Sequence, residues 1–139
     1  MTQMRVDLAA RAAVNTALNC YGSIPDQIET PAFVVGPVED VAYNHTFNTF
    51  GKRTAIYRFA CRVYVGRVDM EDGISNLDPY IDADGATSIH YLLDDQQGEA
   101  VSNTSGSEWT NVRECREVGV YDFGGVQYLG AEFLVEVLQ

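Results

Sequence analysis

The side chains best suited to a metal or nucleophilic site are two histidines, His45 and His90, and three cysteines, Cys20, Cys61 and Cys115. Zinc ligands are usually grouped at short spacings, but these histidines belong to different predicted elements and have no carboxylate or cysteine at such a spacing. Three widely spaced cysteines without a secretion signal predict free thiols. Cys61 continues the apolar face of a predicted strand, so we expect it in the core.

The acidic run Asp78–Gly85 invites comparison with a calcium-binding loop. With Gly85 at the sixth position of such a loop, Tyr80 and Tyr91 would occupy the first and twelfth, where carboxylates are required. We therefore interpret the run as a solvated acidic turn. The chain also lacks a nucleophile elbow, a phosphate-binding glycine loop, a dinucleotide fingerprint and a Cys-x-x-Cys pair. We predict that the protein is not an enzyme and has no catalytic residue, metal or cofactor, although clusters formed in space leave no such motif.

Four charged residues have the spacing for ion pairs across a sheet. Arg58 and Arg62 lie on the polar side of one predicted strand, and Glu132 and Glu136 lie on the polar side of another. If these strands pair antiparallel, the four residues form cross-strand ion pairs, each contributing a fraction of a kcal/mol. The alternative is four separately solvated charges, and the sequence does not decide between the two.

A turn-rich stretch, residues 43–53, is a candidate interface with another protein molecule. It gathers aromatic and basic side chains, namely Tyr43, Phe47, Phe50, Lys52 and Arg53. Aromatic residues and arginine on a projecting loop are the types that anchor protein interfaces. The alternative is that the aromatic side chains fold down on the core.

Hydrophobic periodicity predicts the elements that position these residues. Residues 3–21 follow helical spacing, with Val6, Ala10 and Val14 on the apolar stripe and Arg11 on the wet one. Shorter helices are expected at 69–80 and 87–94, strands at 32–35, within 38–53 and at 54–67, and strand-like stretches at 110–118 and 121–123. The order α-β-β-β-α-α-β-β predicts an α+β fold, in which two to three helices cover one face of a single mixed, largely antiparallel sheet.

The end of the chain predicts the clearest strand. Gly124 and Gly125 form a hairpin turn, and beyond them Ala131, Phe133 and Val135 alternate with polar residues. Because a strand repeats every two residues, this alternation predicts a sheet with one buried side and one accessible side.

Length and composition limit the class of protein. A chain of 139 residues with 46% hydrophobic residues suits one folded domain over residues 1–139. No run approaches the roughly 18 apolar residues of a membrane span, and no signal peptide core is present, so we expect the protein to be cytoplasmic.

The charge of the chain is unevenly distributed. Residues 1–68 hold seven basic and five acidic groups (+2), and residues 69–139 hold two basic and fifteen acidic groups (−13). A net charge of −11 disfavours nucleic-acid binding, and the acidic half would repel DNA.

With these elements placed, the chain resembles the tail terminator, or tail completion, proteins of long-tailed (siphovirus-type) bacteriophages. The resemblance rests on four stretches in the same order, Thr30–Pro37, Tyr57–Arg67, Leu77–Ile89 and Gly124–Leu138. Together with the N-terminal helix they cover nearly the whole chain. The most specific part is Gly-Val-Gln-Tyr-Leu-Gly-Ala-Glu-Phe at 125–133, and none of the stretches is a catalytic signature.

The resemblance implies a virion structural protein, assembled in the host cytoplasm and placed at the head-proximal end of the tail. Such proteins form a homo-oligomeric ring, a hexamer, that caps the tail tube and stops addition of the major tail tube protein. The ring then joins the tail to the head–tail connector or stopper protein. Genomic DNA passes through its channel without specific binding, and no membrane is involved. The family shares no catalytic residue.

Two other classes of protein remain open. A stopper or a neck adaptor from the same head–tail junction shares this size and architecture. A small-ligand-binding or enzymatic α+β domain is the alternative from a different class.

Overall fold

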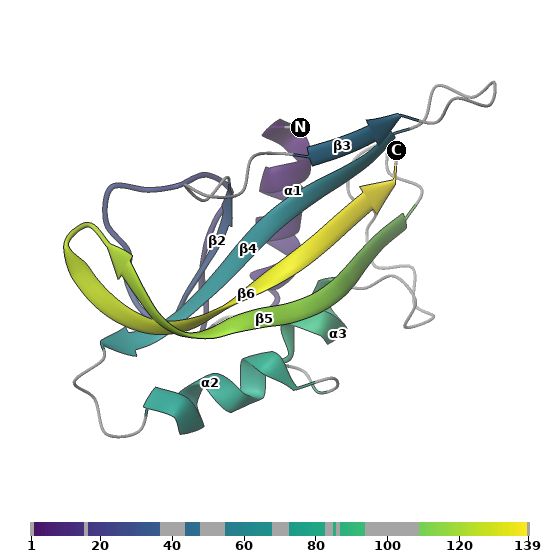
Figure 1. Cartoon of the computed structure of the whole chain (residues 1–139). Helices are drawn as coiled ribbons and strands as arrows, with labels where there is room; N and C mark the ends of the chain where they lie inside the picture. Colours follow the sequence, from purple (N-terminus) through teal and green to yellow (C-terminus); the bar gives the residue numbers. More distant parts are fainter. Residues whose placement is uncertain are drawn as a thin grey trace.

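The computed structural model describes residues 2–15, 17–36, 44–47, 55–67, 73–82, 85, 87–93 and 109–138 of the chain. Its elements, in chain order, are α1 (Thr2–Ala12), β1 (Asn19–Tyr21), β2 (Ala32–Gly36), β3 (Asn44–Phe47), β4 (Ala55–Arg67), α2 (Gly73–Ile81), α3 (Ile89–Leu93), β5 (Trp109–Phe123) and β6 (Val126–Leu138) (Figure 1). The predicted α+β fold, with helices on one face of a single mixed sheet, is confirmed. The predicted order is present, extended by the short strand β1.

The sheet has six strands in the order β1-β2-β4-β6-β5, and β3 also pairs with β4. Among the strands of the described residues, only β1 and β2 run parallel, and every other pair is antiparallel. The two long strands β4 and β6 therefore form the centre of the sheet, and side chains that alternate along them point to opposite faces.

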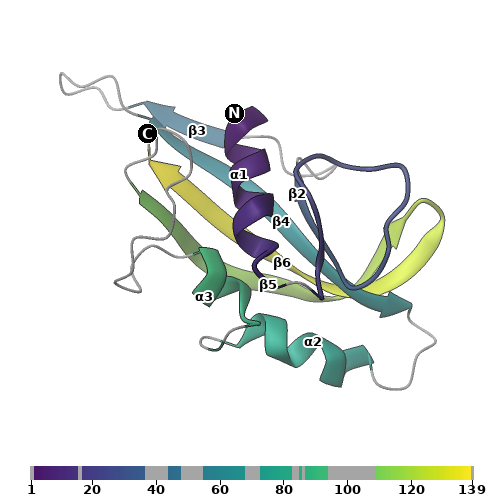
Figure 2. The same ribbon diagram turned by 180° about the vertical axis from the view of Figure 1, so that it is seen from behind.

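All three helices lie on one face, which we call the inner face (Figure 2). Most apolar side chains of β4 and β6 that face them are buried, as the alternation in the sequence predicts, and Tyr57 and Leu129 are partly buried. The core of this face consists of Leu8, Ala9, Ala12, Leu18, Phe33, Val35, Phe59, Cys61, Val63, Val65, Leu77, Ile89, Leu93, Val112, Ala131, Phe133, Val135 and Val137.

The predicted helix over residues 3–21 is wrong beyond Ala12. The last turn tightens, because the amides of Val14 and Asn15 bond to carbonyls only three residues back. The Asn15 side chain then accepts a hydrogen bond from the amide of Ala17, which gives the backbone an alternative to the helix. Residues 19–21 form β1 instead and pair in parallel with residues 32–34 of the neighbouring strand β2.

The predicted face of this helix is also wrong. Val6 and Val14 are 49% and 70% exposed, whereas Leu8 and Ala12 are buried together with the expected wet residue Arg11. The apolar stripe was predicted for a longer helix, over residues 3–21. The observed helix ends at Ala12, and its buried side chains are those that face β2 and α3.

The β5–β6 hairpin turns at the predicted position. Gly124 and Gly125 have φ values of 59° and 81°, and Phe123 pairs with Val126 across them. Two consecutive positive φ values suit a two-residue hairpin turn and explain why both positions are glycine. The hairpin curls away from the plane of the sheet at this end (Figure 1).

Candidate functional site

The face of the sheet opposite the helices, the outer face, carries the charged residues singled out in the sequence. Arg58 lies opposite Glu136 and Arg62 lies opposite Glu132 in the antiparallel register of β4 and β6. The Arg58 Nε is 3.1 Å from Glu136 Oε1, and the Arg62 Nε is 3.3 Å from Glu132 Oε1. The structure thus brings both cross-strand pairs together, rather than leaving four separate charges.

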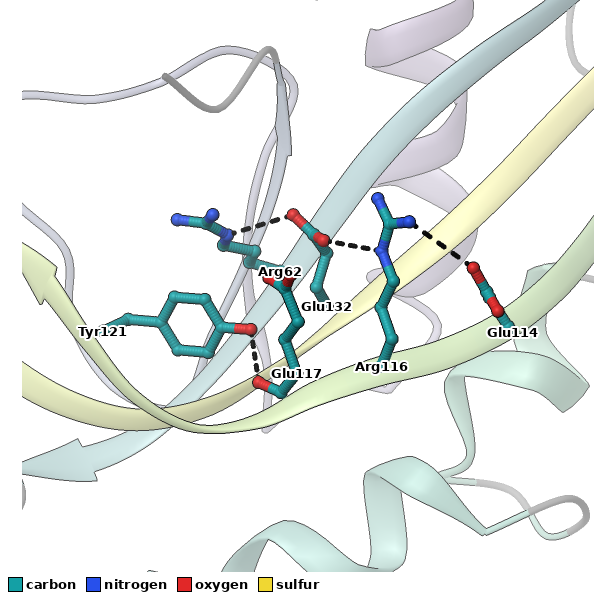
Figure 3. Close-up of polar contacts among 6 residues, drawn as sticks. All are labelled: Arg62, Glu114, Arg116, Glu117, Tyr121 and Glu132. Atoms are coloured by element: carbon teal, nitrogen blue, oxygen red, sulfur yellow. Dashed lines mark hydrogen bonds and ion pairs between the residues drawn. The ribbon is translucent and has the colours of Figure 1, made fainter. Parts of the chain in front are cut away.

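A third strand, β5, adds an arginine to each of these ion pairs, and the sequence did not predict this contribution. Arg116 on β5 places its Nε 2.8 Å from Glu132 Oε2, so each oxygen of this carboxylate meets a different guanidinium (Figure 3). Arg113 lies 4.0 Å from Glu136 in the same way. The outer face therefore carries two charged rows that cross β4, β6 and β5.

A bulge in β5 explains why the sequence does not predict the contact between Arg116 and Glu132. Counting back from the Gly124-Gly125 turn, an uninterrupted hairpin would place Glu117 opposite Glu132, two like charges. The observed register shifts between Arg116 and Gly119, so that Arg116 lies opposite Glu132 instead. Glu117 takes up the extra residue with φ of 52°. The bulge thus replaces a repulsion by an ion pair.

The expected accessibility of this face is wrong at its centre. Glu132 is 1% exposed and the Arg62 side chain is 15% exposed, because an aromatic cluster and the segment between β1 and β2 cover this end. Tyr64 is the middle of the cluster. Its ring meets the rings of Tyr121, Phe123 and Tyr128 edge-on at centroid distances of 5.7–5.9 Å.

Tyr121 connects the aromatic cluster to the charged row. The Arg62 guanidinium carbon lies 4.4 Å from the centroid of its ring, a cation–π contact. Its hydroxyl donates a hydrogen bond to the Glu117 carbonyl at the bulge (Figure 3). Burial is the main cause that raises the pKa of Tyr121 to about 12; Glu132 and Glu117 raise it further, while Arg62 opposes them.

The candidate interface stretch lies almost wholly outside the described residues. Tyr43, Phe50, Lys52 and Arg53 are not among them. Phe47 is the last residue of β3, and its backbone pairs with Ala55. Neither the interface role nor the alternative of aromatic side chains on the core is tested, and both remain as stated from the sequence.

The residues considered for nucleophilic or metal chemistry are dispersed. Cys61 is buried in the core as predicted, and burial raises the pKa of its thiol; Cys20 is half-buried and Cys115 exposed. All three thiols are free. Within the described residues, no cluster of three or more His, Cys, Asp or Glu side chains is arranged to hold a metal ion. No helix among these residues has the length and apolarity to cross a membrane.

Comparison with known proteins gives no assignment. No protein-family model matches the chain, and no curated protein matches it significantly.

Proposed function

We propose that this protein is a tail terminator of a long-tailed bacteriophage, a structural protein without catalytic activity that forms a ring on the head-proximal end of the tail tube. The ring stops addition of the major tail tube protein and then joins the tail to the head–tail connector or stopper. DNA passes through its channel without specific binding.

The observation that carries this proposal is the arrangement of the four stretches that resemble the family. Three of them contain β2, β4 and β6, which are far apart in the sequence but are adjacent strands of the sheet. The fourth, Leu77–Ile89, runs from α2 into α3 on the inner face. The four stretches therefore form three adjacent strands and two helices that cover them, rather than four unrelated segments.

The charge distribution is compatible with a ring. A closed ring needs a heterologous interface, in which two different patches of each subunit meet. A chain whose first half carries +2 and whose second half carries −13 can supply two such patches. The basic patch would include Lys52, Arg53 and Arg67.

Co-purification with candidate partners separates this function from its rivals. A terminator should bind the tube protein, and negative-stain images of the mixture should contain rings of defined size seated on tube ends. A stopper or neck adaptor should instead bind the portal-side proteins and leave the tube protein unbound. A monomer that binds neither and retains a small ligand through purification would point to the ligand-binding or enzymatic class.

A further inference from the structure

A cavity of about 480 Å³ lies on the outer face of the sheet, beside the β5–β6 hairpin. Figure 1 shows the hairpin and the segment between β1 and β2 rising at the same end of the sheet. That segment contributes Ile24 and Pro25 to the cavity wall, and the sheet contributes Arg62, Tyr64 and Phe123. The volume lies within the range of protein ligand sites, and the wall is mixed in polarity, with one guanidinium among apolar and aromatic groups.

The Arg62 guanidinium is held in place before any ligand arrives. Its Nε bonds to Glu132, and its central carbon lies over the ring of Tyr121. Figure 3 shows its terminal nitrogens directed away from Glu132. A guanidinium has five N–H donors, so these contacts leave donors for a ligand in the cavity that Arg62 lines. A fixed planar fork of donors matches a carboxylate.

Arg62 shares its counter-charge with a second arginine. Glu132 supplies one negative charge and is shared by two guanidinium groups, those of Arg62 and Arg116. The second partner of Arg116 is Glu114, whose side chain is 50% exposed and therefore strongly screened by water. Glu132 therefore divides its charge between Arg62 and Arg116, and Arg62 is the member of the row that lines the cavity.

Two exposed carboxylates limit which anion can enter. Asp26 and Asp122 also line the cavity, and both are on the surface. They oppose a phosphate group more strongly than a single carboxylate, because the repulsion grows with the charge of the ligand. Beside the carboxylate position, the rings of Tyr64 and Phe123 offer an apolar surface.

We propose that this cavity receives an acidic side chain of a partner protein, with Arg62 binding the carboxylate and the aromatic wall contacting the residue next to it. This inference specifies the chemistry of the partner segment, an acidic residue followed by an aromatic contact. It does not depend on the terminator function and goes beyond it.

The probe is a blocked dipeptide, N-acetyl-Glu-Tyr-amide, titrated into the isotope-labelled full chain and followed by amide resonances. We expect saturable shifts at cavity positions such as Gly36 and Gly124. The matched N-acetyl-Gln-Tyr-amide should bind at least about tenfold more weakly, because the charge-assisted hydrogen bonds are lost. Inorganic phosphate should also bind more weakly. Equal binding of the Glu and Gln dipeptides, or no shifts at the cavity, would overturn the proposal.

Variants identify the groups involved. Arg62→Lys should weaken dipeptide binding by about tenfold, because lysine lacks the planar fork. Arg58→Lys is the matched control, since Arg58 makes the same kind of cross-strand pair but is not part of the cavity wall. Should Arg62→Lys fail to fold, Asp26→Asn on the exposed rim gives an independent answer. It should tighten binding by about two- to threefold through the loss of one repulsive charge, and unchanged or weaker binding contradicts the proposal.

Discussion

At the scale of single residues, Glu132 is the most deeply buried member of the two charged rows. Its carboxylate is removed from water, and both of its oxygens face arginine side chains from different strands. Glu136 makes the same kind of contacts four residues later, but its partners Arg58 and Arg113 are 28% and 58% exposed. The two glutamates therefore form a natural comparison between a buried and a partly solvated ion pair.

Glu132→Gln should lower the free energy of unfolding by about 2–4 kcal/mol, because it leaves Arg62 and Arg116 without their shared counter-charge in a largely buried position. Urea denaturation followed by tryptophan fluorescence measures the change. Glu136→Gln is the control and should cost less than about 1 kcal/mol, since water screens its partners. Equal losses for the two variants would mean that burial does not decide the strength of these pairs.

The raised pKa of Tyr121 gives a pH dependence with a definite sign. Its ordinary value of 10.0 applies to the unfolded chain, and the folded value is about 12. The stabilising contribution is therefore complete below about pH 10 and is lost as the pH rises through 12, because the unfolded chain releases the proton first. Stability curves from pH 8 to 12 should fall less steeply for Tyr121→Phe than for the unchanged protein. Parallel curves would show that Tyr121 titrates normally.

At the scale of elements, the strands β4 and β6 depend on a close backbone approach. A side chain at Gly130 would place its Cβ 2.3 Å from the Val63 carbonyl oxygen and 3.3 Å from the Tyr121 ring. The register of the pair shifts just beyond this point, between Tyr64 and Gly66. Glycine at this position thus lets the central strands approach one another beside an irregularity.

Gly130→Ala should therefore destabilise the fold by about 2 kcal/mol or more, since the obstacle is backbone rather than a flexible side chain. Thermal or urea unfolding measures the effect. Gly119→Ala on β5 is the matched control, because nothing lies within 4 Å of a Cβ there, and it should change stability by less than about 0.5 kcal/mol. A tolerated Gly130→Ala would contradict the described register.

The elements show what the sequence could and could not predict. Period-two alternation predicted β4 and β6 well, because one face of each strand is largely buried. It also put Arg58 and Arg62 on the same side of the sheet as Glu132 and Glu136, but the pairing itself came from the register of β4 and β6. The contribution of Arg116 was not predictable, because a one-residue bulge changes the register of β5. The burial of Glu132 depends on an aromatic cluster and on the segment between β1 and β2, which is distant in the sequence. No local sequence pattern predicts that this segment covers Glu132.

At the scale of the whole molecule, the proposed ring requires a subunit interface, for which residues 43–53 are the candidate. Replacing Phe47, Phe50 and Arg53 together by alanine should abolish rings and tube capping while the subunit stays folded, because aromatic and arginine anchors supply most of an interface's affinity. Negative-stain microscopy and circular dichroism measure the two properties. The control variant combines Val14→Ala, Gln27→Ala and Tyr91→Ala, all at exposed positions elsewhere, and should retain its rings. Intact, functional rings in the Phe47/Phe50/Arg53 variant would end this assignment.

The growth of tail tubes tests the central proposal most directly. Purified tube protein, polymerising in the presence of increasing amounts of this protein, would be followed by electron microscopy of tube lengths and ends. We predict that elongation stops at substoichiometric amounts and that one end of each tube carries a ring. Tubes that grow to the same length with bare ends, although the added protein is folded, would contradict the terminator function.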